Sequence, residues 1–472
     1  MTIQEILILI AAALTLGFIY QRTKWVNPLM IASIIFIYWL QPETELRYLG
    51  YWLPTISLTI MVICWAVTAS PENRSRPAHL GSLALIFLVL IALQLLRVFD
   101  LSRLLGFVAV PRSLGAFLVP LLLLGIAGLL FRSRQTTPPG ALWGTFALLI
   151  LIFLVLKTPA LAEGASKAWR AVKGQSLALA SAAELSWLGY SYLAFRILHT
   201  IRDKQAGRLP DIALNEYITY LVFFPAFVAG PIARVEQFTT SLREITGTFD
   251  EHLAAGSKRI LIGLFKKFVL ADSLALFALN AQNASQPTST LGGWVLLISF
   301  SFQIYFDFSG YTDIAIGLGK YFDIQLPENF NQPYLKPNLT QFWSNWHMSL
   351  TNWFRAYFFN PISRSLRKKK LSALAILFIT QISTMVLVGL WHGVTINFAV
   401  WGCWHGLGLL VQNRWSAWIK KRYKSAEQRW LQNLRDGFGT LLTFAFVTLG
   451  WVWFVLPTPK LALDFLGLLF GI

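Results

Sequence analysis

The chain has 472 residues, of which 56% are hydrophobic and only 13% are charged. Soluble domains hold roughly 45–50% apolar residues even when glycine is counted, so the composition excludes an ordinary soluble protein and indicates an integral membrane protein. The formal net charge is +18, but the basic residues lie mostly in short loops between apolar runs, where positive charge faces the cytoplasm and anionic lipid. We therefore expect the lipid bilayer as a partner and no nucleic acid.

Apolar runs of about 20 residues, long enough to cross a bilayer, recur along the whole chain. Such runs must be helices, because unpaired backbone groups cannot face lipid and the runs lack the alternating pattern of a membrane barrel. The predicted fold class is all-α, a polytopic membrane protein with about 11–13 transmembrane helices. The candidate spans are residues 3–20, 25–41, 51–69, 79–96, 113–131, 140–157, 176–198, 216–233, 259–283, 292–318, 371–391, 394–412 and 437–457.

The character of these runs changes at about residue 175. Before it, they are rich in Leu, Ile and Ala and hold few polar residues. After it, polar and ionisable residues fall inside the runs, and because burying such groups in a membrane is costly they mark a functional site or a buried polar network. We predict an N-terminal transmembrane scaffold over residues 1–175 and a core that holds the functional site over 176–472, within a single integral membrane domain.

Residues 223–234, FFPAFVAGPIAR, interrupt an apolar run with two prolines and a glycine. Proline removes a backbone donor, and irregular backbone is tolerated at membrane depth only where protein or a water-filled cavity surrounds it. The segment therefore predicts a re-entrant or broken helix.

Residues 303–313 hold four polar side chains in a segment that is otherwise fit to cross the bilayer. They are Asp307, Ser309, Tyr311 and Asp313, with Gly310 among them. Two interpretations stay open: the segment lines a cavity, or it is a helix end that has met water.

Residues 333–363 have a pattern of their own, rich in tryptophan and asparagine. Asn338, followed three residues later by Gln341, predicts a helix start. One face of that helix would carry Trp343, Trp346, Leu350, Trp353 and Tyr357 at helical spacing. The opposite face would carry Asn345, Ser349, Asn352 and Arg355. This pattern is typical of a helix lying along the membrane interface, and it places His347 at the edge of the aromatic face.

The positions of three other histidines have an ordinary explanation without a catalytic role. They lie at span ends or in loops, where an interfacial or surface histidine is common: His79, His199 and His252.

His392 and His405 stand in twin WHG triplets at residues 391–393 and 404–406. Each ring could pack against its neighbouring indole and donate to a backbone carbonyl, and for His405 we favour this interpretation. For His392 a role as general base stays open beside it, because the unperturbed pKa of histidine is near 6.5 and suits proton transfer at neutral pH.

The two cysteines exclude a disulfide framework and a zinc cluster, and we expect no metal. Cys403 lies in an apolar helix-like run, where a buried thiol usually stays protonated and inert. No G-x-S-x-G motif is present, so any acyl chemistry should run by direct attack without a covalent enzyme intermediate.

Four segments together resemble the membrane-bound O-acyltransferase (MBOAT) family. They read GPIARVEQF, then FQIYFDFSGYTDIAIGLGKYFDI followed by LPENFNQPY, then FWSNWHMSLTNWFRAYFFNPI, and finally GLWHGVTINFAVWGCWHGLGL. The resemblance covers about residues 185–457 in order, and it is similar in detail to the bacterial branch that holds the alginate O-acetylation and teichoic acid D-alanylation transfer proteins. It implies an MBOAT-like helical bundle, with interfacial and re-entrant helices around a central tunnel.

The resemblance further implies that His392 and His347 are catalytic and lie at that tunnel. It implies transfer of an acyl group from a thioester donor to a hydroxyl. In this branch the implied donor is cytoplasmic, acetyl-coenzyme A or an acyl carrier protein, and the implied acceptor is an extracytoplasmic glycan. A partner extracytoplasmic acyltransferase could complete the transfer. The implied location is the bacterial cytoplasmic (inner) membrane, with no tightly bound cofactor. Further candidates for contact with substrate or the tunnel are Asp307, Ser309, Tyr311, Asn345, Trp346, Arg355 and Trp391.

One departure from the family pattern favours acetyl transfer. D-alanylation members typically carry an acidic residue after GPI, where this chain has Ala233 and then Arg234. D-alanyl transfer to a teichoic acid-type polymer is the first alternative. A transporter or flippase is the second, although it predicts inverted repeats that the sequence does not display. A subunit without activity is the third, although it predicts loss of the histidines.

Basic residues are expected where the thioester donor binds. We expect Arg355, Lys336 and the basic run at residues 364–370 near the cytoplasmic mouth, where a donor carries negative charge. For the last residues of that run, a solvated positive loop is an equally good interpretation.

Overall fold

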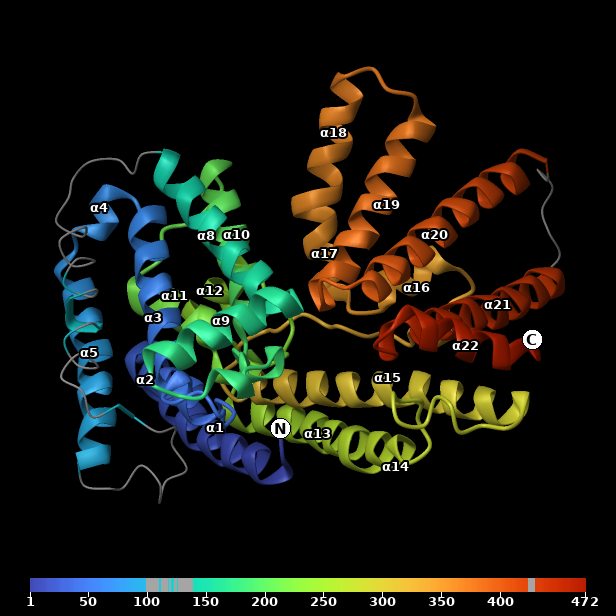
Figure 1. Ribbon diagram of the computed structural model, residues 1–472. Helices are drawn as coiled ribbons and strands as arrows, with labels where there is room; N and C mark the ends of the chain where they lie inside the picture. Colours follow the sequence, from blue (N-terminus) through green and yellow to red (C-terminus); the bar gives the residue numbers. More distant parts are fainter. Residues whose placement is uncertain (99–109, 112–117, 119, 123–124, 126–138, 423–428) are drawn as a thin grey trace. The chain divides into compact units, whose positions relative to one another are not determined.

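The computed structural model describes the whole chain except residues 99–109, 112–117, 119, 123–124, 126–138 and 423–428 (Figure 1). The described residues are helical and contain no β-strand, which agrees with the predicted all-α class. They form two compact units, each built from two stretches of chain. Unit 1 holds Met1–Ile260 and Ile314–Leu326, and unit 2 holds Leu261–Asp313 and Pro327–Ile472.

Seven described helices are long and apolar enough to cross a membrane, so the chain is a multi-pass membrane protein. They cover Ile3–Thr23, Leu49–Thr68, Pro77–Leu96, Gly140–Lys157, Thr290–Lys320, Ala373–His392 and Trp430–Val455. Most of the candidate span at residues 113–131 lies outside the described residues. The boundary between scaffold and core near residue 175 does not coincide with a boundary between the units, and it stays a prediction.

Unit 1 contains the N-terminal helices and the interrupted segment. Its helices are α1 (Ile3–Thr23), α2 (Val26–Trp39), α3 (Leu49–Thr68), α4 (Pro71–Arg74), α5 (Pro77–Val98), α8 (Pro139–Lys157), α9 (Pro159–Val172), α10 (Tyr190–Gln205), α11 (Leu214–Val222), α12 (Val235–Arg243) and most of α13 (Phe249–Leu264), with 3-10 turns η1 (Leu177–Leu179), η2 (Ala182–Glu184) and η3 (Phe224–Ala226). Helix α3 is the most enclosed of the candidate spans.

Two predicted spans are wrong. Residues 176–198 begin with the turns η1 and η2, and the helix starts only at Tyr190, after Gly189 in the left-handed region at φ 73°. Residues 216–233 end their helix at Val222. The second result agrees with the broken helix predicted from Pro225 and Pro231, and it shows that the apolar run is divided into two short pieces.

A buried arginine explains how the break at residue 222 is tolerated. The guanidinium of Arg196, on α10, donates to the carbonyl of Leu221 at 2.8 Å and to that of Ala226 at 3.0 Å. A third contact, to the carbonyl of Tyr220, measures 3.4 Å. Carbonyls at a helix end lack intrahelical partners, and in an apolar surrounding they must be satisfied by protein. Arg196 supplies these donors.

Two histidines of unit 1 are buried and structural, which corrects the expectation of surface or interfacial positions. His199 Nε2 accepts from the Val235 amide at 3.3 Å and lies 3.0 Å from the Tyr220 hydroxyl. His79 Nδ1 accepts from the Leu214 amide at 3.4 Å. Both rings therefore satisfy backbone at the starts of neighbouring helices.

Unit 2 contains the segments with the tryptophan and histidine motifs. Its helices are the π-helical turn η4 (Phe265–Ala271), α14 (Asp272–Ala275), most of α15 (Thr290–Lys320), the 3-10 turn η5 (Pro333–Leu335), α16 (Leu339–Asn345), α17 (Met348–Phe354), the π-helical turn η6 (Arg355–Phe359), α18 (Asn360–Lys368), α19 (Ala373–His392), α20 (Ile396–Arg422), α21 (Arg429–Val455) and α22 (Pro459–Phe470). Helices α19 and α20 form an extensive antiparallel pair.

Glycine makes this helix pair close. A Cβ atom on Gly402 would lie 2.5 Å from the Met385 carbonyl oxygen of α19, and one on Gly389 would lie 2.1 Å from the Phe398 carbonyl oxygen of α20. Neither position has room for a side chain, because non-bonded carbon and oxygen atoms do not approach this closely. The start of α20 is thereby held against the end of α19, where His392 lies.

Candidate functional site

His347 lies at a sharp turn between two short helices. The Gln341 amide donates to the Asn338 side chain at 2.9 Å, so the predicted helix start at Asn338 is confirmed. That helix ends at Asn345, His347 adopts φ 41° and ψ 54°, and α17 begins at Met348. The predicted single helix with one aromatic and one polar face is therefore wrong, because a left-handed residue interrupts a right-handed helix.

The aromatic side chains of this segment do not form a surface stripe. Trp343 and Trp346 are buried, and so is Ser349 from the predicted polar face. Trp346 packs against Phe330 and Trp451, with ring centroids 5.1 and 5.3 Å apart. The segment at residues 338–354 is therefore part of the core of unit 2.

Asn329 holds the turn that contains His347. The Met348 amide donates to the Asn329 carbonyl at 2.9 Å. The amide and hydroxyl of Ser349 both donate to Asn329 Oδ1, at 3.2 and 2.6 Å. A non-glycine residue in the left-handed region costs about 1–3 kcal/mol and persists only where its surroundings determine it. These contacts provide that determination for His347.

The imidazole of His347 is enclosed by aromatic rings and has only 3% of its surface exposed. Its centroid lies 4.7 Å from that of Phe308 on α15 and 6.1 Å from that of Trp391 on α19. Neither ring nitrogen has a hydrogen-bond partner among the described residues. Buried polar atoms are normally paired, and each exception needs an explanation. A substrate group that bonds to this ring would provide one.

Burial also sets the protonation state of His347, which lies outside the seven candidate spans. It lowers the pKa of the His347 imidazole to about 3, because a charged ring would lose its hydration. The ring is therefore neutral near pH 7, with one nitrogen able to donate and the other able to accept.

His392 is the last residue of α19, and rings from two neighbouring helices, α20 and α21, surround it. Its centroid lies 5.8 Å from Phe398, 5.7 Å from Trp401 and 4.7 Å from Phe454. The side chain is half-buried. A Cβ atom at the next residue, Gly393, would lie 2.8 Å from the Phe398 ring. Both glycines of the GLWHG motif thus leave room for Phe398. The Phe398 ring stacks on the imidazole of His392.

Trp391 connects the two histidines. Its indole lies 4.5 Å from the His392 ring and 6.1 Å from the His347 ring, centroid to centroid. The imidazoles are therefore no farther apart than the sum of these two lengths, about 11 Å. A substrate with a few atoms between its reacting groups can contact both rings at once.

The polar residues of α15 lie within a continuous helix and not at its end. Lys267 pairs with Asp307, and Lys266 Nζ lies 2.7 Å from Asp313 Oδ2. The crossing is close, because a Cβ atom on Gly310 would meet the Lys267 amide nitrogen at 2.8 Å. Asp307 and Asp313 therefore belong to a network of ion pairs between η4 and α15, which neither interpretation from the sequence included.

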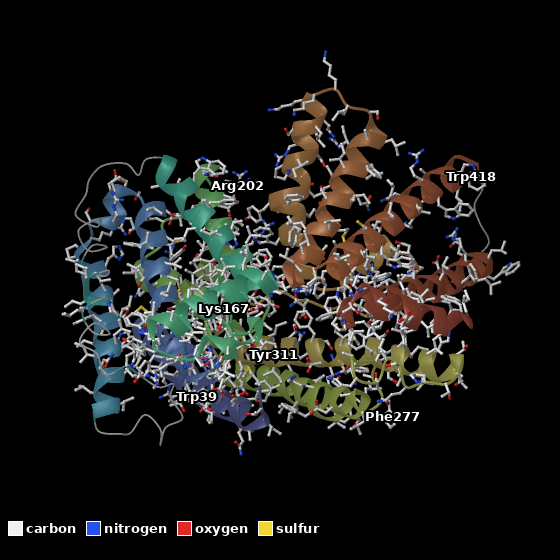
Figure 2. All side chains as sticks on the ribbon, viewed as in Figure 1. Trp39, Lys167, Arg202, Phe277, Tyr311 and Trp418 are labelled. Atoms are coloured by element: carbon white, nitrogen blue, oxygen red, sulfur yellow. The ribbon has the colours of Figure 1, made fainter. Side chains whose placement is uncertain are left out.

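The remaining candidates from the sequence have varied surroundings. Ser309 and Tyr311 are buried on α15, where Figure 2 labels Tyr311. The Asn345 side chain donates to the Gln341 carbonyl at 2.7 Å, Arg355 is exposed, and residues 367–370 are exposed at the end of α18.

His405 is fully buried on α20 and packs between indoles. Its centroid lies 5.2 Å from Trp343 and 4.8 Å from Trp401. Packing against indoles agrees with the structural interpretation that we favoured from the sequence. The predicted donation to a backbone carbonyl is wrong, because neither ring nitrogen has a hydrogen-bond partner among the described residues. The described residues contain no group of three or more His, Cys, Asp or Glu side chains that could hold a metal ion.

Sequence reasoning missed Asn329 as a site residue. It stands in the LPENFNQPY segment beside Glu328 and near Asn331, both of which are exposed, whereas Asn329 is fully buried. Spacing alone does not separate these three polar residues. The only signal was a polar residue directly before Phe330 in a loop rich in aromatic residues.

Comparison with known proteins gives consistent results for this region. The family model of MBOAT, membrane-bound O-acyltransferases, matches residues 141–447. The chain is 34% identical over 268 residues to the probable alginate O-acetylase AlgI of Pseudomonas syringae pv. tomato, covering 57% of this chain and 48% of that protein. It is 34% identical over 259 residues to the peptidoglycan O-acetyltransferase of Helicobacter pylori, covering 54% and 47%.

A third relative carries a different acyl group in its name. The teichoic acid D-alanyltransferase of Bacillus subtilis is 31% identical over 272 residues, covering 56% of this chain and 68% of that protein. The chain spans about half the length of the two O-acetylating relatives that it matches.

Proposed function

The chain belongs to the membrane-bound O-acyltransferase family, and from that premise we propose that it transfers an acyl group, most directly acetyl, to a hydroxyl of an extracytoplasmic polysaccharide or envelope glycan. The donor is a cytoplasmic thioester, acetyl-coenzyme A or an acyl carrier protein, used as a substrate. The protein acts in the bacterial cytoplasmic membrane. The observation that supports this proposal is that the His347 and His392 rings both contact the Trp391 indole, with centroids 6.1 and 4.5 Å from it.

In the proposed reaction His392 is the general base. A glycan hydroxyl is a weak nucleophile, so its proton must leave as its oxygen bonds to the thioester carbonyl carbon. The proton moves to a nitrogen of His392. The tetrahedral intermediate then expels the thiolate, which takes the proton back and leaves as a thiol, and the ester remains on the glycan.

His347 is the proposed helper in this reaction. As a neutral ring with two unpartnered nitrogens, it can donate to one reacting group and accept from another. It could orient the acceptor hydroxyl, orient the thioester or share the proton. Each of these roles uses the burial of the ring, because a dry surrounding strengthens hydrogen bonds to the reacting atoms.

The donor side is proposed to lie near the basic residues that follow α17. Arg355 and Arg367–Lys370 are exposed and could attract the phosphates of coenzyme A or an acidic carrier protein. Reversing the charges of Arg367 and Lys368 should raise the KM for the donor. An unchanged KM would instead favour a loop that only follows the positive-inside rule.

D-alanyl transfer is the second candidate, because the D-alanyltransferase of Bacillus subtilis is covered over a larger share of its length than the O-acetylating relatives. The absence of an acidic residue after GPI, where Ala233 and Arg234 stand, favours acetyl. A dedicated extracytoplasmic acyltransferase could receive the group in either case.

Mass spectrometry of envelope glycans tests the proposal. Glycans from cells with wild-type protein, with His392→Ala and without the protein should be compared for ester-linked acetyl and D-alanyl groups. We expect one of these esters only with the wild-type protein. If glycan acylation is the same in all three, the proposed function is wrong. Transport of unmodified glycan that depends on the protein would favour a flippase.

A further inference from the structure

The donors of Ser349 determine which way the side-chain amide of Asn329 is turned. Its Oδ1 faces the backbone amide of Ser349 at 3.2 Å and the Ser349 hydroxyl at 2.6 Å. A backbone amide can only donate, so the atom facing it must be the amide oxygen and not the nitrogen. The Nδ2 group of Asn329 therefore points away from Ser349.

That Nδ2 group has no partner. Asn329 is fully buried, and Nδ2 forms no hydrogen bond within the described part of the chain. A buried NH2 group without an acceptor costs about 1–3 kcal/mol. The bonds from Ser349 use only the oxygen of the Asn329 side chain, so they leave its NH2 group for another acceptor.

The unpartnered donor lies in a loop that is hydrogen-bonded to the turn holding the unpartnered imidazole. The Met348 amide, next to His347, donates to the Asn329 carbonyl at 2.9 Å. Phe308 contacts both His347, at 4.7 Å, and Phe330, the residue after Asn329, at 5.0 Å between centroids. Three buried polar atoms without partners, Asn329 Nδ2 and both His347 ring nitrogens, thus belong to two segments that are bonded to each other and share contacts with Phe308.

Acyl transfer by direct attack has a specific need for such a donor. When the hydroxyl oxygen bonds to the thioester carbon, the carbonyl oxygen becomes an oxyanion, and fixed donors at that oxygen are usually a large part of catalysis. A donor locked by its own oxygen, as in Asn329, needs no reorganisation during the reaction.

We infer that Asn329 Nδ2 donates to the thioester carbonyl oxygen and stabilises the oxyanion that forms there. This inference rests on the proposed function. The group that Asn329 binds is the carbonyl of the thioester, so the contact is the same for every acyl chain. In the proposed step, the bond from the hydroxyl oxygen to the carbonyl carbon forms, the proton goes to His392, and the carbonyl electron pair moves onto the oxygen held by Asn329. When the pair returns, the bond from carbon to sulfur breaks.

Asn329→Asp is the sharpest test, because it keeps the acceptor for Ser349 and replaces the NH2 donor with an oxygen. The two donors from Ser349 favour the ionised carboxylate and burial favours the neutral acid, so Asn329→Leu, which has no donor at any pH, is measured beside it. With full-length purified protein, acetyl-coenzyme A and envelope glycan, we expect kcat to fall about 10²- to 10³-fold. The KM for acetyl-coenzyme A and the thermal stability should stay close to wild type.

Asn331→Asp is the matched control, since it makes the same chemical change at an exposed position two residues away. Its kcat should equal that of wild type. Ser349→Ala is a second variant, which removes one of the two bonds that lock the Asn329 amide. It should lower kcat by about 10-fold with little change in KM, and it keeps the inference testable if Asn329→Asp fails to fold.

The outcomes separate this inference from the proposed function. If Asn329→Asp, or the folded Ser349→Ala protein in its place, keeps wild-type kcat while His392→Ala is inactive, the inference is wrong and the proposed function stands. If the wild-type protein transfers no acyl group, both are wrong. A loss of thermal stability with unchanged kcat would show that Asn329 only supports the turn.

Discussion

The imidazole of His347 lies 6.1 Å from the indole of Trp391, centroid to centroid. The residue that follows Trp391 is His392, whose ring lies 4.5 Å from the same indole, so two histidines that are 45 positions apart in the sequence contact one side chain. Since both rings contact one indole, the two imidazoles lie within about 11 Å of each other. We therefore propose that the two histidines act together in the reaction.

Substitution of the two histidines should therefore have graded effects. His392→Ala should lower kcat by at least about 10²-fold, since general base catalysis typically contributes 10²–10⁴-fold. His347→Ala should give a rate between that of His392→Ala and wild type, because a helper is less costly to lose than the base. Acyl transfer by purified variants, with folding checked by size-exclusion chromatography, measures both. Near wild-type transfer by folded His392→Ala would contradict the mechanism.

His405 should respond to shape and not to chemistry. It is fully buried between Trp343 and Trp401, and neither ring nitrogen has a hydrogen-bond partner among the described residues. His405→Phe keeps an aromatic ring there and should retain kcat with a small change in melting temperature. His405→Ala leaves a cavity and should cost about 2–5 kcal/mol, as other large-to-small core changes do. An inactive but stable His405→Phe protein would instead assign it a chemical role.

Local patterns predicted the parts of the site that depend on neighbouring residues. Asn338 caps α16 through the Gln341 amide, and Pro225 lies where the helix is broken. Both results follow from bonds within a few positions along the chain, which the sequence displays directly. The two WHG triplets were likewise visible, and the structure places one at a helix end and the other in a packed helix interior.

The features that failed depend on contacts between distant segments. The turn at His347 exists because residues near Asn329 bind it, and an isolated segment with the same helical spacing would continue as one helix. The ion pairs of Asp307 and Asp313 use Lys267 and Lys266, 40 and 47 positions away. Periodicity is a local signal, so it contains no information about such partners.

Arg196 should be essential to the stability of unit 1. It donates to the carbonyls of Leu221 and Ala226, and Arg196→Met would leave both buried acceptors unsatisfied, at about 1–3 kcal/mol each. We expect a markedly lower melting temperature in detergent. Arg202→Met is the matched control on the same helix, because its guanidinium donates to the nearby Gln205 side chain at 2.8 Å and not to a helix end; Figure 2 labels this residue. Equal melting temperatures for the two variants would refute this role.

Acid should weaken the contact between α9 and η2 through Glu184, which lies outside the seven candidate spans. Hydrogen bonds from Arg170 and from Ser166 lower the pKa of the Glu184 carboxyl to about 2. In an unfolded chain the pKa of glutamate is about 4.3. A folded pKa below the unfolded one means that the unfolded state binds the proton first. The ionised Glu184 carboxylate therefore stabilises the folded protein fully above about pH 4.3, and this stabilisation is lost as pH falls towards 2.

Melting temperatures between pH 6 and pH 3 measure this effect. Wild-type protein should lose stability over the lower part of that range, and Glu184→Gln should start lower and lose less, because its side chain has no proton to gain. Glu163→Gln is the matched control. Glu163 pairs with Lys167 at 2.7 Å, also on α9, but both side chains are about half exposed, and exposed pairs contribute little. Its profile should follow wild type, and a Glu184→Gln profile that also follows wild type would show that the buried pair is not what acid disrupts.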